Sequence, residues 1–100
     1  MFFAKFTING QTTAELYDSW DKFHADTFNP ATEVITLIEF KIHGKDYQTR
    51  KESLRTLAID WSHADIEGIY MSDLADISNW FFLKGKRFGL LDEFIENAIC

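Results

Sequence analysis

The sequence is poor in the residues that mark several common protein classes. Its 100 residues include one cysteine, one proline and five glycines. The single cysteine, Cys100, excludes an intrachain disulfide and a cysteine metal cluster, and so little proline and glycine excludes a collagen-like repeat or a low-complexity linker. No apolar run approaches the roughly 18 residues of a membrane span, and the lysine at position 5 argues against a signal peptide. We therefore expect a cytoplasmic protein that does not enter a membrane.

The composition predicts one folded domain over residues 1–100. Apolar residues make up 46% of the chain and charged residues 26%, which is typical of a globular protein rather than a disordered one. A chain of this length buries about two thirds of its unfolded surface, so a hydrophobic core is possible without disulfides.

Strand signals open the chain and are followed by a turn. Apolar residues alternate with polar ones over 2–8, the period of a half-buried strand, and Asn9-Gly10 favours a tight turn. Thr12 and Glu15 then form a capping-box pattern. Together with the apolar positions Leu16, Trp20 and Phe23 they predict a helix that begins near residue 12 and fades near residue 26.

The clearest strand pattern covers residues 33–43. One face is apolar along its length and the other only at its start, so we expect a strand that is central at one end and solvated at the other. The stretch 44–46 resembles a hairpin turn, with 47–49 as a short returning strand. Three antiparallel strands are enough for a stable sheet with one buried face.

The second half of the chain is mainly helical in its periodicity. Capping boxes and apolar stripes predict helices that begin near Thr49, at Ser72 and at Gly89, with Gly85 closing the middle one. Residues 62–71 fit either a helical turn or an edge strand. The predicted fold is α+β: a small antiparallel sheet of three or four strands with three to four helices packed mainly on one face. The residues expected in the core are Phe6, Ile8, Trp20, Ile38, Phe40, Leu57, Trp61, Ile77, Phe81, Leu90 and Phe94.

No residue pattern indicates an enzyme or a cofactor site. The chain lacks a nucleophile elbow, a phosphate loop and a dinucleotide glycine pattern. The repeated tripeptides at His24 and His63 carry possible metal ligands, but their spacing does not place two ligands on one helix face. We therefore predict no catalytic residues, no cofactor and no metal.

Charge and aromatic content favour a protein-binding module. Sixteen acidic residues against ten basic ones give a net charge of −6, and aromatic residues make up 16% of the chain. So many rings overfill a small core, and rings left at the surface anchor interfaces. Carboxylates repel a phosphate backbone, so we expect no direct DNA binding; on a helix they can also imitate phosphates.

The leading hypothesis is therefore a small acidic antagonist that occupies a nucleic-acid-binding surface of a larger protein, with a nucleic-acid-processing complex as the expected partner. Antirestriction and anti-CRISPR proteins of phages and plasmids are similar in size and charge. The span between residues 60 and 76 contains five carboxylates and no basic residue, so we place the partner there. The predicted partner-binding residues are Asp60, Asp65, Glu67, Tyr70, Asp73, Asp76 and Trp80. The first helix is the competing acidic face.

Two other classes remain open. One is a structural subunit of a complex. The other is a small nucleic-acid-binding protein that uses the chain's basic residues, namely Arg50, Lys51, Arg55, Lys84, Lys86 and Arg87. Ile77-Ser78-Asn79-Trp80 before the second basic run resembles part of a helix-turn-helix, but Glu67 and Met71 stand where that motif requires a small residue and a glycine.

Overall fold

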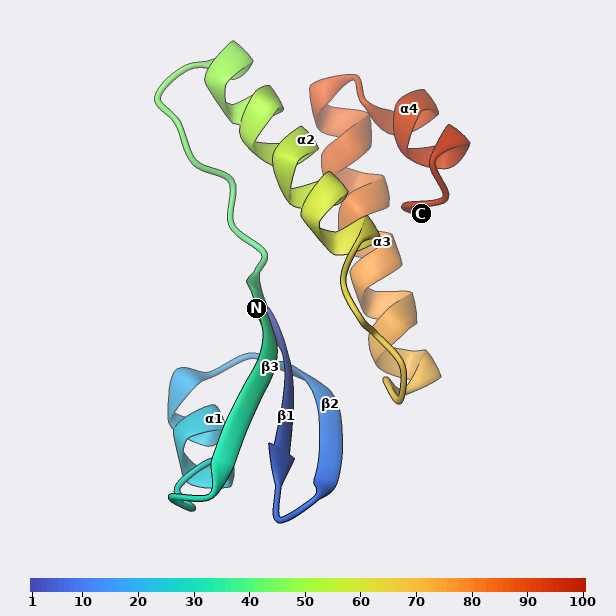
Figure 1. The fold of residues 1–100 in the computed structure, drawn as a ribbon. Coiled ribbons are helices and arrows are strands. Elements are labelled where there is room, and N and C mark those ends of the chain that lie inside the picture. Colours follow the sequence, from blue (N-terminus) through green and yellow to red (C-terminus); the bar gives the residue numbers. More distant parts are fainter. The chain divides into compact units, whose positions relative to one another are not determined.

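The computed structural model describes all 100 residues, which divide into two compact units. Unit 1 comprises Met1–Phe40 and Asp65–Asp73, and unit 2 comprises Lys41–Ala64 and Leu74–Cys100. The elements, in chain order (Figure 1), are β1 (Phe2–Ile8), β2 (Gln11–Tyr17), α1 (Trp20–Asp26), β3 (Thr32–Glu39), α2 (Tyr47–Ser62), α3 (Met71–Phe88) and α4 (Leu91–Glu96). The predicted α+β fold, with a three-stranded antiparallel sheet and four helices, is confirmed. The single domain over residues 1–100 stays a prediction.

The sheet has the order β2-β1-β3, and a two-residue turn joins its first two strands. Asn9 and Gly10 both have positive φ, 50° and 83°, and Ile8 pairs with Gln11 across the turn. Two positive φ values give the turn a twist that matches a hairpin. The predicted helix from residue 12 is therefore wrong, because the chain returns as β2. Helix α1 begins only at Trp20, where the Ser19 side chain accepts a hydrogen bond from the Asp21 N–H.

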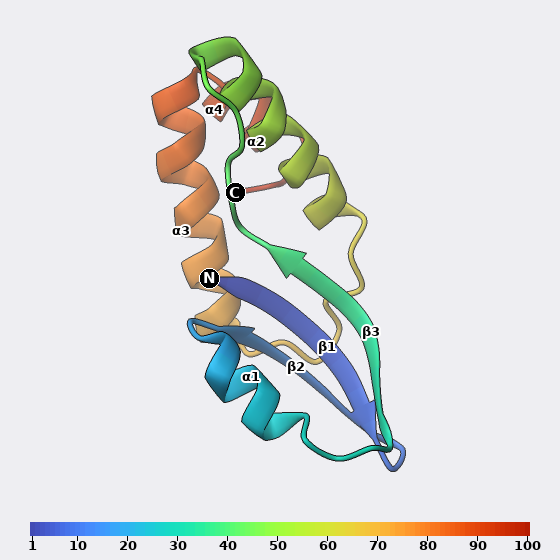
Figure 2. The same cartoon turned by 90° about the vertical axis from the view of Figure 1, so that its left-hand side faces the viewer.

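One face of the sheet packs against α1. Phe2, Ala4 and Phe6 of β1 and Tyr17 of β2 form a buried cluster with Phe23, the one buried residue of α1. The Phe23 ring meets the Phe2, Phe6 and Tyr17 rings edge-on, with centroids 5.4–6.1 Å apart. Edge-to-face geometry is favourable for aromatic pairs. In Figure 2, α1 lies along β1 and β2.

Strand β3 departs from its prediction in length and position. It ends at Glu39 rather than near His43, and it is an edge strand, paired with β1 alone. Ile35 is an extra residue, because Lys5 pairs with Thr36 while Phe6 pairs with Val34. The predicted hairpin at 44–49 is wrong. Asp46 instead caps α2 by accepting the Thr49 N–H at 2.8 Å, and this hydrogen bond lowers the pKa of the Asp46 carboxyl.

Unit 2 contains α2, α4 and the part of α3 from Leu74 onward. The predicted stripe of α2, namely Leu54, Leu57, Ala58 and Trp61, is buried. Helix α3 begins at Met71, one residue before the predicted cap, and runs past Gly85 to Phe88. Gly85 does not close the helix, because it packs beneath α4, where a Cβ would lie 2.7 Å from Cδ2 of Phe94. Gly89, with a φ of 71°, ends the helix instead, and the Leu90 N–H donates to the Gly85 carbonyl.

Most of the predicted core residues are buried. Trp20 is exposed: the residue is 41% exposed, and its ring stacks on that of Phe2 at a centroid distance of 3.9 Å. Ile8 and Ile38 are half-buried, and the other eight are buried. Five of the sixteen aromatic side chains lie exposed, as the surplus of rings suggested: Trp20, Phe28, Tyr47, Tyr70 and Phe82. No helix combines the length and the apolarity that a membrane crossing needs.

Candidate protein-interaction surface

The seven predicted partner-binding residues fall in two different units. Unit 1 holds four of them on one segment, Asp65–Asp73: these are Asp65, Glu67, Tyr70 and Asp73. Unit 2 holds Asp60 on α2 together with Asp76 and Trp80 on α3. The four residues of unit 1 are therefore the part of the prediction that lies on one segment of one unit.

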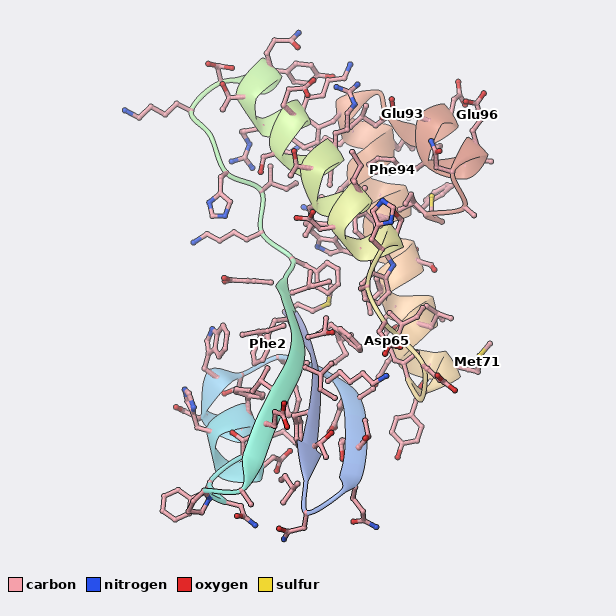
Figure 3. All side chains as sticks on the ribbon, in the orientation of Figure 1. Phe2, Asp65, Met71, Glu93, Phe94 and Glu96 are labelled. Atoms are coloured by element: carbon pink, nitrogen blue, oxygen red, sulfur yellow. The ribbon has the colours of Figure 1, made fainter.

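Asp65 is engaged inside unit 1. Its carboxylate lies 2.9 Å from Nζ of Lys5, a lysine on β1 whose side chain is 8% exposed, whereas the Asp65 side chain is 58% exposed. A buried ammonium is costly without a counter-charge. The pKa of the Asp65 carboxyl is lowered mainly by its hydrogen bond with Lys5 and to a smaller extent by the hydrogen bond that the Glu67 N–H donates to it. Asp65 thus ties its segment to the sheet (Figure 3).

Asp73 also has a structural role. It is half-buried and accepts a hydrogen bond from the backbone N–H of Leu16, on the edge strand β2, at 3.4 Å. Lys5, Thr12 and Ala14 of the sheet line one side of a cavity of about 300 Å³, and Glu67 and Gly68 line the other. The segment therefore lies against the face of the sheet that carries Lys5, opposite the face that α1 covers.

The outward side of this segment combines charge with apolar surface. Glu67 is exposed, Tyr70 is 67% exposed and Met71 is 78% exposed. Figure 3 shows the Met71 side chain pointing away from the ribbon. A ring and a thioether that are this largely exposed can anchor a partner. Of the predicted site, Glu67 and Tyr70 are the residues best placed to do so.

The competing acidic face around α1 is partly engaged as well. Glu15 pairs with Lys22 at 3.2 Å, and the Tyr17 hydroxyl donates to Asp26 at 2.9 Å. Burial and the Asp26 hydrogen bond strongly raise the pKa of Tyr17, which therefore remains protonated. Asp18 and Asp21 are exposed beside this pair.

Charge divides unequally between the units. Unit 1 carries nine acidic and two basic residues, a net charge of −7, and unit 2 carries seven acidic and eight basic residues, a net charge of +1. The two basic residues of unit 1, Lys5 and Lys22, are both paired with carboxylates. The acidic character of the chain is therefore a property of unit 1.

Sequence reasoning missed one exposed apolar surface, on β3. Val34, Ile35 and Leu37 are between 45% and 50% exposed. The signal was in the sequence, because this strand is apolar on both faces at its start. That pattern predicts a strand that is central at its start, whereas β3 lies at the edge of the sheet.

Unit 2 contains a cavity and a basic end. The cavity has a volume of about 340 Å³. It is lined by residues of α2 and α4 and by residues that follow each helix, including His63, Phe94 and Asn97. Arg55 at its wall donates to Glu93 at 3.0 Å and also pairs with Glu52, and these two carboxylates raise the pKa of Arg55. Its cation is thus already balanced within unit 2.

The basic end lies where α2 begins and α3 ends. The Tyr47 and Phe88 rings are 5.5 Å apart, and Nζ of Lys51 lies 4.0 Å from where a Cβ on Gly89 would be. This contact brings the two basic runs to one end of unit 2: Lys45, Arg50 and Lys51 from one run, and Lys86 and Arg87 from the other. Arg55 is part of the acidic pairing described above.

The structure shows no cluster of metal ligands, and its one thiol, that of Cys100, is half-buried. No group of three or more histidine, cysteine, aspartate or glutamate side chains is arranged to hold a metal ion. Burial raises the pKa of the Cys100 thiol, which disfavours the reactive thiolate.

Comparisons with known proteins found no match for this chain. No protein-family model matches the chain, and neither the curated proteins nor the solved structures that were compared contain a match.

Proposed function

We propose that this protein is a non-enzymatic binding module whose unit 1 docks on a basic surface of a larger protein. The observation that carries the proposal is the concentration of charge: unit 1 has a net charge of −7, while unit 2 is close to neutral. The electrostatic field of so concentrated a negative charge accelerates association with a basic surface and disfavours association with an acidic one.

The surface that we assign combines both parts of a binding site. Exposed carboxylates, of which Glu67 and Asp18 are examples, supply attraction, and the exposed Tyr70 and Met71 supply apolar anchors. Asp65 and Asp73 position the segment through Lys5 and the Leu16 N–H rather than by meeting the partner. A role in partner binding stays a prediction for three residues of unit 2, namely Asp60, Asp76 and Trp80.

The partner class follows from the same charges. Lysine and arginine side chains that bind phosphates also bind carboxylates with similar geometry. The basic surface of a nucleic-acid-processing complex is therefore the target we assign, which makes this chain an antagonist of the antirestriction or anti-CRISPR type.

A pair of charge variants tests this proposal. Asp18→Asn with Glu67→Gln removes two exposed carboxylates from unit 1, and Asp92→Asn with Glu96→Gln removes two from unit 2. The tagged wild-type chain is used to capture proteins from a host lysate, and the captured protein is then assayed for nucleic-acid binding with and without this chain. We expect the unit 1 variant to weaken both capture and competition, and the unit 2 variant to behave as wild type. Equal loss in both variants, or capture without competition, contradicts the antagonist function.

A second candidate function rests on the basic end of unit 2. The contact between Tyr47 and Phe88 brings to one end of unit 2 the two segments that carry Lys45, Arg50, Lys51, Lys86 and Arg87. This end would bind a phosphate backbone if the chain were a nucleic-acid-binding protein, and binding would then decrease steeply with salt. A Lys86→Glu, Arg87→Glu variant that loses DNA or RNA binding at physiological salt would favour this candidate.

A further inference from the structure

Strand β3 presents an outer side that pairs with nothing in the chain. The sheet order β2-β1-β3 leaves β3 with a neighbour on one side only. With eight residues it is also the longest strand. The outer side of such a strand is a row of backbone N–H and C=O groups that another strand can pair with.

This edge is apolar where edge strands are usually protected by charge. Val34, Ile35 and Leu37 are each about half exposed. Val34 pairs with Phe6, and Leu37 with Ala4, so both lie on the face of the sheet that α1 covers elsewhere. The Phe23 ring of α1 contacts rings of β1 and β2. The β3 part of that face is left uncovered.

Carboxylates flank the apolar stretch at both ends. Glu33 and Glu39 are exposed and six residues apart, which corresponds to about 20 Å along a strand. No basic residue lies on β3. The edge therefore matches a strand that is apolar in the middle and carries a lysine or arginine at each end.

A second copy of this chain matches the edge poorly. A symmetric antiparallel pair of β3 strands would bring the Glu33 and Glu39 carboxylates of both copies to one edge, with no basic residue of β3 to balance them. Like charges brought close together destabilise a strand pair. Unit 1 as a whole, with a net charge of −7, also repels its own copy.

We infer that β3 binds an extended segment of the basic partner, which adds to the sheet as a fourth strand. The main-chain hydrogen bonds of the added strand would supply affinity. Alternate apolar side chains of the added segment would pack against Val34 and Leu37 and supply specificity. The inference rests on the proposed function for the basic nature of the partner, and it adds the mode by which that partner docks.

A model peptide tests this docking mode without knowledge of the partner. The probe is a seven-residue peptide with blocked termini, lysine at both ends, and alternating valine and threonine between them. Backbone amide shifts of the full chain are followed by NMR during titration at low salt. We expect the largest shifts within Thr32–Glu39, together with new protection of β3 amides from hydrogen exchange. The same peptide with a proline at its centre should cause no such shifts, since it cannot continue the ladder.

Two variants with the same change in net charge distinguish binding at the β3 edge from general attraction by the negative charge of unit 1. Glu33→Gln with Glu39→Gln should weaken peptide binding about three- to tenfold. Glu15→Gln with Asp21→Asn, in the same unit but on β2 and α1 rather than β3, should weaken it less than twofold. Equal weakening in both variants overturns the inference, because binding would then follow unit charge alone.

Other outcomes are equally decisive. Shifts confined to Gln11–Tyr17, or no shifts at millimolar peptide, overturn strand addition at β3. A dimer in sedimentation equilibrium that is lost in the Leu37→Lys variant identifies a second copy as the occupant and overturns the inference. If strand addition fails while partner capture still depends on Asp18 and Glu67, the proposed function stands alone. If the peptide adds to β3 but no nucleic-acid-processing protein is captured, the proposed function fails and the edge site stands.

Discussion

Lys5 shows how one buried charge organises a distant part of the chain. It lies on β1, with a side chain that is 8% exposed, and its ammonium meets the carboxylate of Asp65. The strand pattern of residues 2–8 could predict which face Lys5 shares with Phe3, but not which carboxylate would compensate it. Sixty residues separate the pair, and local periodicity contains no information on such contacts.

Asp65→Asn should destabilise the protein in a pH-dependent way. The lowered pKa of Asp65 means that the ion pair stabilises the fold above the ordinary pKa of the carboxyl, and that this stabilisation is lost as the pH falls through the lowered value. Urea unfolding should therefore show a wild-type advantage at neutral pH that shrinks in acid.

The neighbouring Glu67→Gln is the matched control and should change stability little at either pH. Adding Lys5→Met to Asp65→Asn should recover much of the loss, because the uncompensated ammonium is then removed. A wild-type advantage that stays constant with pH would show that the ion pair does not contribute.

Ala98→Gly should stabilise the protein by about 1 kcal/mol. Ala98 has a φ of 56°, and the Ile99 N–H donates to the Phe94 carbonyl across it, so this alanine ends α4 in the conformation that glycine favours. The same substitution at Ala75, exposed inside α3, should instead destabilise by about 1 kcal/mol. Chemical denaturation of both variants checks the opposite signs, and a loss of stability in both would contradict the strain at Ala98.

At the scale of elements, the first hairpin shows why local patterns mislead. Thr12 and Glu15 fit a helix cap, and Leu16, Trp20 and Phe23 fit a helical stripe, yet the chain forms β2 through Tyr17. The Asn9-Gly10 turn decides the outcome, because its geometry returns the chain alongside β1. Pairing with β1 buries Ala14 and Tyr17, a gain that a helix cap of about 1 kcal/mol cannot match.

The second half was easier to predict because its apolar stripes are longer. Leu54, Leu57, Ala58 and Trp61 are buried as expected. The ends of these helices were wrong where a residue had two possible roles. Asp46 could begin a turn or cap a helix, and Gly85 could end α3 or allow the close approach of Phe94. Tertiary contacts decide between such roles.

Phe23→Ala should cost about 3–5 kcal/mol and release α1 from the sheet. Phe23 is the one buried residue of this short helix, and its ring meets those of Phe2, Phe6 and Tyr17. The exposed neighbour His24→Ala should change stability by less than about 0.5 kcal/mol. Equilibrium unfolding measures both, and equal effects would mean that α1 is not held through Phe23.

For the molecule as a whole, the sum of the charges follows from the sequence, whereas their distribution follows from the fold. The net charge of −6 could be read directly. The concentration of −7 in unit 1 depends on residues 65–73 joining the first 40 residues, which no composition shift along the chain indicates. The predicted site was therefore placed on one sequence span, whereas the fold divides that span between two units.

The isolated protein should show no measurable binding to duplex DNA at physiological salt. The five basic residues at the end of unit 2 would supply few phosphate contacts, and such contacts weaken strongly as salt increases. A mobility-shift assay at physiological salt, repeated at low salt, checks this expectation. Micromolar or tighter binding at physiological salt would favour the nucleic-acid-binding alternative over the antagonist.

Tyr70 and the carboxylates of unit 1 should affect different steps of partner binding. Tyr70 is 67% exposed and directly precedes the exposed Met71, so its truncation removes contact area that forms in the complex. Tyr70→Ala should therefore raise the dissociation rate of the captured partner about tenfold and leave the association rate within about twofold.

Asp18→Asn with Glu67→Gln should do the opposite, because dispersed charge acts mainly on the encounter. We expect slower association, a weaker salt dependence and little change in dissociation. Tyr47→Ala, which removes a half-exposed tyrosine from unit 2, is the matched control and should leave both rates unchanged. Surface plasmon resonance at several salt concentrations separates the two rates. If Tyr47→Ala speeds dissociation while Tyr70→Ala has no effect, the aromatic anchor lies in unit 2 and the partner binds at the basic end instead.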